Sequence, residues 1–168
     1  MSPSHTHVVG VVREVLADLD LDWSEVTPGV FSVALPGTFK LTTECALEVG
    51  HHGLSVRAFV ARNPDENHAG VYRWLLERNL KLVAVAFSVD ALGDIYLTGK
   101  VALATVTAAE VDLLLGTVAQ TADASFNSIL SLGFAESIRR EWVWRRSRGV
   151  STANLAAFTH LDPGETIR

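Results

Sequence analysis

Mostly apolar residues alternate with mostly polar ones from Phe39 to Val49, the clearest strand pattern in the chain. Successive side chains of a strand point to opposite faces, so one face of this segment is predicted to be buried and the other to meet water. The predicted buried face carries Phe39, Leu41, Thr43, Cys45, Leu47 and Val49. One wet face is typical of an antiparallel sheet covered on one side. Residues 50–53 then predict a hairpin loop, and residues 54–62 the returning strand.

The next segment has the pattern of a helix. Asn63 is its predicted N-cap, with Pro64 at the first helical position and Glu66 placed to reach back to the cap. The predicted buried stripe is Val71, Tyr72, Leu75, Leu76 and Leu80. Trp74 lies off that stripe, so we expect an exposed aromatic side chain there.

Three further strands are indicated. Residues 30–35 read as a short strand between turn signals, and residues 82–89 and 95–103 form a second predicted hairpin. The connection between the last two runs from Asp90 to Asp94 and contains Gly93, as expected of a turn.

Helices are predicted at both ends of the chain. Ser4 or Thr6 can cap a first helix, and Thr107 with Glu110 forms a capping box for a long third one. Gly133 is predicted to bend or break the third helix, after which residues 134–148 continue as a basic helical segment.

The predicted order of elements is therefore α-β-β-β-α-β-β-α. Two runs of antiparallel strands separated by a helix predict an α+β fold, a five-stranded antiparallel sheet with helices packed on it. We expect residues 5–148 to form a single domain. Residues 149–168 show no periodic apolar stripe, so a loosely packed or disordered C-terminal tail is predicted.

Composition narrows the functional class. The chain has 168 residues and a net charge of −5, which argues against a protein that coats nucleic acid. A single cysteine excludes an internal disulfide, and neither a signal peptide nor a membrane-spanning run is visible. We expect a soluble cytoplasmic protein. Residues 136–148 hold five arginines against two glutamates, a net +3, so the rest of the chain carries −8.

No arrangement of side chains reads as a catalytic centre, a cofactor site or a metal site. Cys45 is expected to be a buried structural thiol, without the electropositive setting or the base that a nucleophile needs. The pairs His5/His7 and His51/His52 lack the four converging ligands of a closed zinc site. Glycine-rich phosphate loops and nucleophile-elbow motifs are absent from the sequence.

The segment from Trp142 to Arg148 is the candidate interaction surface, because tryptophan and arginine often anchor interfaces. The alternatives are internal pairing, through Glu141–Arg145 and Glu136–Arg140 one helical turn apart, and contact with a phosphate and a stacked base. The candidate partner-binding residues are Trp74, Arg140, Trp144, Arg145, Arg146 and Arg148.

Several segments together resemble the YbjN-domain proteins, in particular an actinobacterial branch of that family. The matching segments are Glu66-Asn67-His68, Val71–Asn79, Val85–Asp90, Gly93–Leu97, Phe126-Asn127 and Glu141–Arg145. The resemblance covers roughly residues 5–148 and implies the fold of the type III secretion chaperones. It also implies a small, acidic, often dimeric protein that binds other polypeptides without catalysis or a cofactor, and it assigns no catalytic residue.

The function expected from the sequence is accordingly that of a non-catalytic, chaperone-like protein that binds another polypeptide and forms a homodimer. The alternative is a protein that binds a small or anionic ligand through the arginine-rich C-terminal segment. Neither a membrane nor a nucleic acid is expected as a partner.

Overall fold

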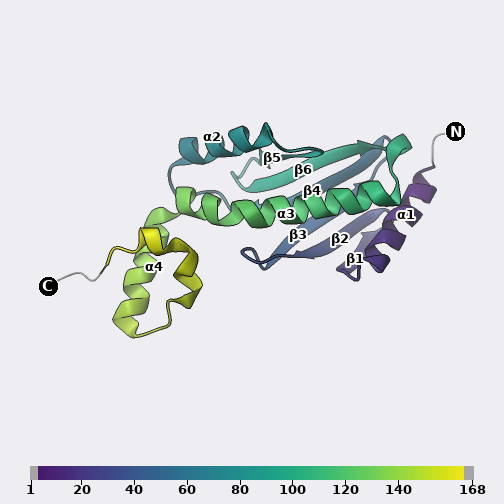
Figure 1. Ribbon diagram of the computed structural model, residues 1–168. Helices are drawn as coiled ribbons and strands as arrows, with labels where there is room; N and C mark the ends of the chain where they lie inside the picture. Colours follow the sequence, from purple (N-terminus) through teal and green to yellow (C-terminus); the bar gives the residue numbers. More distant parts are fainter. Residues whose placement is uncertain (1–3, 165–168) are drawn as a thin grey trace.

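The computed structural model describes residues 4–164 and contains one antiparallel sheet of six strands in the order β1-β2-β3-β4-β6-β5 (Figure 1). The strands are β1 (Asp22–Thr27), β2 (Val30–Pro36), β3 (Thr42–Val49), β4 (Gly53–Ala61), β5 (Val85–Val89) and β6 (Ile95–Ala102). The helices are α1 (His5–Asp18), α2 (His68–Asn79), α3 (Ala108–Gly133) and α4 (Ala135–Arg148), with 3-10 segments η1 (Leu103–Thr105) and η2 (Ala153–Leu161). The predicted α+β class is confirmed.

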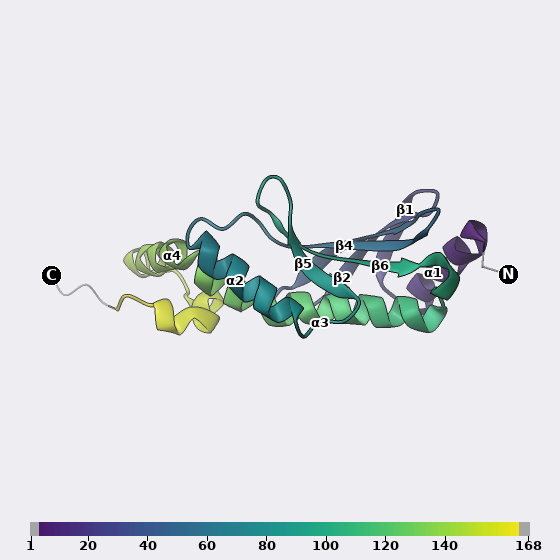
Figure 2. The same cartoon turned by 90° about the horizontal axis from the view of Figure 1, so that it is seen from above.

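Helices α1, α2 and α3 lie on one face of the sheet, and α3 runs along the whole of it (Figure 2). The alternation predicted for β3 is present, since Thr43, Cys45, Leu47 and Val49 are buried and the residues between them are exposed. No helix among the described residues covers the opposite face of the sheet (Figure 2). No helix among residues 4–164 is long and apolar enough to cross a membrane.

The sheet has one strand more than the five predicted. The additional strand is β1, which pairs with β2 from Asp22↔Ala34 to Thr27↔Val30. It is an edge strand in which only Trp23 and Glu25 are partly buried, and the Trp23 ring packs 6.0 Å from that of Phe31. An edge strand that buries so few side chains has no apolar alternation, and for this reason the sequence pattern did not predict it.

The start of α2 also differs from the prediction. The helix begins at His68 after Asn67, which has a left-handed backbone, and not after Asn63. Asn63 instead ties the chain to the β5–β6 turn: its amide N–H donates to Asp94 and its side chain donates to the Leu92 carbonyl. The predicted stripe of α2 is only half right, because Leu76 and Leu80 are 67% and 87% exposed.

The long third helix begins and ends as predicted. The Thr107 hydroxyl accepts a hydrogen bond from the Glu110 N–H at 3.2 Å, and α3 ends at Gly133. A Cβ at Gly133 would lie 2.8 Å from Pro64, so the close approach of these two segments needs glycine. Helix α4 then leaves the sheet and projects from the body of the molecule (Figure 1).

Residues 153–161 differ from the predicted loose tail. Segment η2 folds back on α4, and together they enclose a second apolar cluster, separate from the main core. The cluster consists of Phe134, Ile138, Trp142, Leu155, Phe158 and Leu161. The three η2 members recur at every third residue, which is the period of a 3-10 helix and not of an α-helix. We call α4 and η2 the C-terminal unit; residues 165–168 lie outside the described part of the chain.

Candidate functional site

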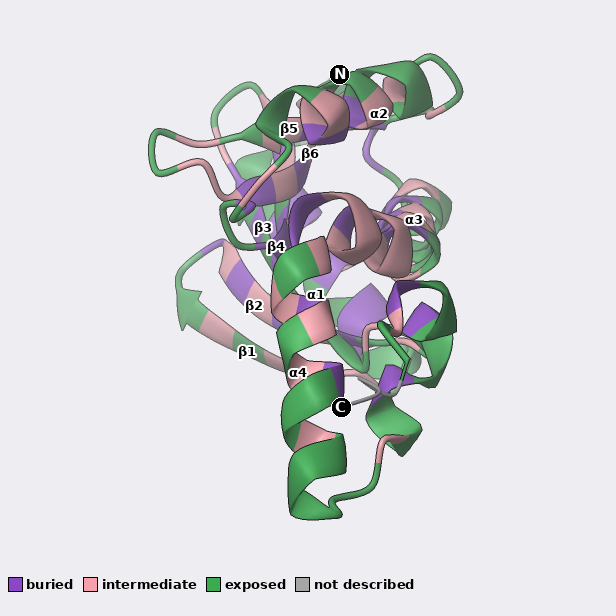
Figure 3. Cartoon of the chain, turned by 90° about the vertical axis from the view of Figure 1, so that its left-hand side faces the viewer, coloured by how far each residue is buried: buried purple, intermediate pink, exposed green. Residues whose placement is uncertain are grey.

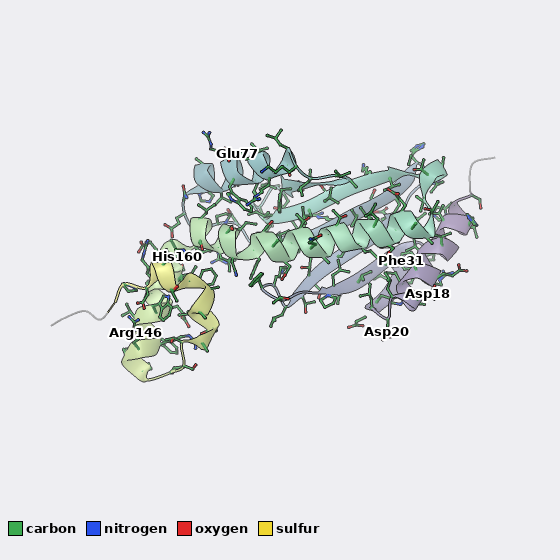
Figure 4. All side chains as sticks on the ribbon, in the orientation of Figure 1. Asp18, Asp20, Phe31, Glu77, Arg146 and His160 are labelled. Atoms are coloured by element: carbon green, nitrogen blue, oxygen red, sulfur yellow. The ribbon has the colours of Figure 1, made fainter. Side chains whose placement is uncertain are left out.

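The six residues that the sequence suggested for partner binding lie in two separate places. Trp74 is half-buried on α2, packed 6.3 Å from the Phe87 ring and 4.7 Å from the Arg78 guanidinium. The other five, Arg140, Trp144, Arg145, Arg146 and Arg148, all lie on α4. Helices α2 and α4 are well apart in Figures 3 and 4, and in Figure 4 Glu77 marks α2 and Arg146 marks α4. The structure therefore does not bring Trp74 to the arginines.

Two of these arginines hold the C-terminal unit together. Arg145 donates to Glu141, as predicted, and to the Ser151 carbonyl at 2.8 Å. Arg146 pairs with Asp162 and lies 5.2 Å from the centre of the Trp142 ring. The hydrogen bond from Arg146, with a second from the Gly164 N–H, lowers the pKa of Asp162 from its ordinary value. The charges of Arg145 and Arg146 are thus balanced within the chain.

The remaining candidates on α4 are more open. Trp144 is 49% exposed, and Arg148 is exposed at the end of the helix. Arg140 donates to the Ser137 hydroxyl at 2.9 Å. Glu136 pairs with Arg139 and not with Arg140, the partner that the sequence suggested.

An apolar pocket of about 480 Å³ lies where the C-terminal unit meets the end of the sheet. Its floor and walls come from four places distant in sequence: the β2–β3 turn, the end of β4, the second half of α3, and the C-terminal unit. The lining residues are Lys40, Phe59, Val60, Ala61, Arg62, Phe126, Leu130, Phe134, Ser137, Ile138, Glu141 and Leu155. A pocket of this size that is mainly apolar with a few polar groups is typical of a binding site.

Lys40 brings a positive charge to this pocket. Its ammonium lies 5.5 Å from the centre of the Phe59 ring and 5.2 Å from that of Phe126. Burial lowers the pKa of Lys40 from its ordinary value, and the negative charge of Glu44 opposes that shift. The aromatic faces stabilise the cation in part, but no ion pair of Lys40 is present among residues 4–164.

A single carboxylate fixes the backbone that carries Lys40. Asp123 on α3 accepts hydrogen bonds from the amide N–H groups of Thr38, Phe39 and Lys40, at 2.8, 2.7 and 2.9 Å. These bonds hold the β2–β3 turn against α3. They also explain why Phe39, predicted to face the core, is exposed in the turn.

Strands β3 and β4 separate next to the pocket. Their register ends at Cys45↔Ala58, although β3 begins at Thr42 and β4 continues to Ala61. Beyond that point β3 still pairs with β2, and β4 still pairs with β6 across a bulge. Residues 42–44 of β3 and residues 59–61 of β4 therefore face each other without pairing as neighbouring strands. Thr43, Val60 and Ala61 are at most 4% exposed, so these strand edges lie inside the molecule and are not open to a further strand.

The far wall of the pocket is held in place by contacts before α2. The Asp65 carboxylate accepts two hydrogen bonds from Arg62 and one from the Ser137 hydroxyl. The hydrogen bonds from Arg62 are the main reason that the pKa of Asp65 is lowered, and Ser137 contributes less. Glu66 accepts from the Glu136 N–H at 2.7 Å, so it caps α4 and not α2, the helix for which the sequence suggested it.

The cysteine and the histidines, the other residues considered for catalysis or metal binding, have surroundings that favour neither role in the described part of the chain. Burial, and secondarily the charge of Glu44, raises the pKa of the Cys45 thiol to about 12, so this thiol is protonated at neutral pH. Residues 4–164 hold no cluster of three or more histidine, cysteine, aspartate or glutamate side chains that could bind a metal ion. His5 instead makes a 2.8 Å hydrogen bond to the Val49 carbonyl.

The pocket was not predicted, because its residues are separated by up to about a hundred positions. One signal was available: Phe59 alternates with Val56, Ala58 and Val60 in such a way that it falls on the polar face of β4. Phe126 on α3 is only partly buried and lines the pocket.

Two solved structures share this fold. In the heterodimeric complex ExoU–SpcU from the type III secretion system of Pseudomonas aeruginosa, the similarity has a TM-score of 0.50 at 16% identity. It covers 66% of this chain and 91% of the other. In the ExsC–ExsE complex the TM-score is 0.53 at 16% identity, over 72% and 92% of the two chains. At this identity the likeness concerns the fold alone, and it confirms the predicted type III secretion chaperone-like architecture.

Comparison with sequence relatives and with a family profile identifies the family. "Uncharacterized protein ML2442" of Mycobacterium leprae is 46% identical over 160 residues, which cover 92% of this chain and 87% of that protein. "Uncharacterized protein Rv0487" of Mycobacterium tuberculosis is 47% identical over 168 residues, covering 97% and 92%. The family profile of YbjN, described as "Putative bacterial sensory transduction regulator", matches residues 9–131, and the chain therefore belongs to the YbjN family.

Proposed function

We propose that this chain is a non-catalytic cytoplasmic protein that binds another polypeptide in the pocket between the sheet and the C-terminal unit. The observation that carries the proposal is the apolar pocket of about 480 Å³ at the point where β3 and β4 separate. A pocket of this kind suits a large apolar side chain of the partner.

The fold comparison supports a polypeptide partner. Both structural neighbours were solved as complexes of two different proteins. A thiol with a pKa of about 12 offers no nucleophile near neutral pH, which is consistent with a binding function.

A ligand-binding function of the arginine-rich segment is the less supported alternative. Arg145 and Arg146 are already engaged, one with Glu141 and Ser151 and the other with Asp162. An anionic ligand would have to compete with these internal partners. Of the residues suggested for partner binding, we retain Trp144 and Arg148 as an exposed secondary surface on α4.

The proposal is tested by selecting peptides on the full chain from a phage-displayed library of random 12-residue sequences. We expect enriched peptides to bind wild-type protein and to protect the amides of residues 59–62 from hydrogen exchange. Leu130→Trp, which fills the pocket, should weaken that binding about tenfold or more. The matched control is Leu113→Trp, on the exposed face of the same helix. Failure of the wild type to enrich any peptide, or equal binding by Leu130→Trp, would contradict the proposal.

We also place the expected homodimer on the outer face of α2. The side chains of Tyr72, Leu76 and Leu80 there line a hollow of about 560 Å³ with Ala69, Arg73 and Glu77. In an antiparallel pair of α2 helices related by a twofold axis at Leu76, Tyr72 faces Leu80 of the second copy. Arg73 and Glu77 lie on one flank, where they already form an ion pair within each helix at 2.9 Å. The face is therefore apolar at its centre, and the charges of Arg73 and Glu77 on its flank are balanced within each copy.

Sedimentation at tens of micromolar protein tests this interface. The wild type should sediment as a dimer, and Leu76→Glu with Leu80→Glu as a monomer, because four carboxylates would then face one another in the contact. Leu113→Glu changes another exposed leucine, on α3, and should leave the dimer intact. A monomeric wild type would rule out the dimer, and a dimer that survives the double change would place its interface elsewhere.

A further inference from the structure

The C-terminal unit creates the pocket and is not part of the family core. Five lining residues, Phe134, Ser137, Ile138, Glu141 and Leu155, lie beyond residue 131, where the match to the family profile ends. The mycobacterial relatives match over 92–97% of this chain, so the similarity extends into that region. The pocket thus depends on residues that lie outside the family match but inside the region of similarity to the mycobacterial relatives.

Two of the charged side chains that line the pocket, Arg62 and Glu141, have ion-pair partners, whereas Lys40 has none among the described residues. Arg62 is neutralised by two hydrogen bonds to Asp65, at 2.6 and 2.9 Å, and Glu141 is paired with Arg145 at 2.6 Å. Lys40 is the lining cation without such a partner among the described residues, and Glu44 acts on it only from a distance. A partly buried ammonium held only by two aromatic rings is stabilised further by a carboxylate that arrives with a ligand.

We propose that the pocket selects segments of a partner polypeptide in which a large apolar side chain lies next to an aspartate or glutamate. This inference rests on the proposed function and specifies its partner. The apolar side chain fills the space between Phe126, Leu130 and Ile138, and the neighbouring carboxylate meets the ammonium of Lys40.

A fatty acid shares the combination of an apolar body and a carboxylate, and it would use the apolar interior and Lys40 in the same way. A polypeptide is favoured here by the proposed function on which the inference rests, and competition by a fatty acid is therefore one of the outcomes of the test.

The test compares peptide selections on wild type, Lys40→Glu and Lys100→Glu, each as the full chain. Lys100 is an exposed lysine on β6 and provides the matched change of charge away from the pocket. Peptides from the wild type should carry Asp or Glu beside Phe, Leu or Trp, and synthetic copies should bind Lys40→Glu about tenfold more weakly or worse. Selection on Lys40→Glu should favour Lys or Arg in place of the acid, whereas Lys100→Glu should select as the wild type does.

Each remaining outcome has a distinct meaning. Peptides that respond to Leu130→Trp but lack an acidic residue, or bind Lys40→Glu as well as the wild type, would overturn this inference and leave the proposed function standing. Competition by dodecanoate, titrated calorimetrically and binding more tightly than the best peptide, would also overturn it. A wild type that enriches no peptide would remove the proposed function itself.

Discussion

Trp142→Ala is expected to release η2 from α4 while the sheet stays folded. The Trp142 ring is 6% exposed, its indole N–H donates to the Phe158 carbonyl at 3.3 Å, and Arg146 lies against its face. Replacing a buried tryptophan with alanine costs about 3–5 kcal/mol. Only six buried side chains make up this cluster, so the loss should open the unit locally and not unfold the whole chain.

Hydrogen exchange is the measurement that separates these two outcomes. Amides of residues 153–161 should exchange about a hundredfold faster in Trp142→Ala, as expected for a loss of roughly 3 kcal/mol, while amides of β3 and β4 keep their protection. Peptide binding should weaken at the same time, because Ile138 and Leu155 line the pocket.

Trp144→Ala is the matched control, since it removes the same side chain two positions along the same helix. Trp144 is 49% exposed and belongs to neither apolar cluster, so we expect a change of less than about 0.5 kcal/mol. Equal effects of the two changes would show that η2 does not depend on the packing described here.

The parts of the fold that the sequence predicted are those with strong, regular patterns. The alternation in β3 and the capping box at Thr107 each depend on residues close together in the chain, and both are present in the structure. Strand β1 was missed because an edge strand buries little, and Trp23 is almost alone in packing inward. Segment η2 was missed because its buried side chains follow a spacing of three, which a search for α-helical spacing does not detect.

The candidate site could not be predicted from the sequence, for a different reason. Its residues converge only through tertiary contacts, such as those of Glu66 with the start of α4 and of Asp65 with Ser137. The sequence did suggest that the arginines near the C-terminus matter. Two of them turn out to fasten the unit that forms one wall of the pocket, so their effect on binding would be indirect.

Asp123→Ala should loosen the β2–β3 turn and displace Lys40 from the pocket. The lost carboxylate oxygen accepts three backbone hydrogen bonds, and bonds to a charged group are worth about 1.5–3 kcal/mol each when buried. Because Asp123 is only partly buried, we expect a total loss of about 2–3 kcal/mol in the free energy of unfolding, measured by urea denaturation.

Asp123→Asn keeps an oxygen acceptor without the charge and should lose about half as much. Asp112→Ala, an exposed aspartate on the same helix, should change stability by no more than about 0.5 kcal/mol. If acidic peptides bound Asp123→Ala as tightly as the wild type, the position of Lys40 would not depend on Asp123, and the carboxylate would be a stabilising contact alone.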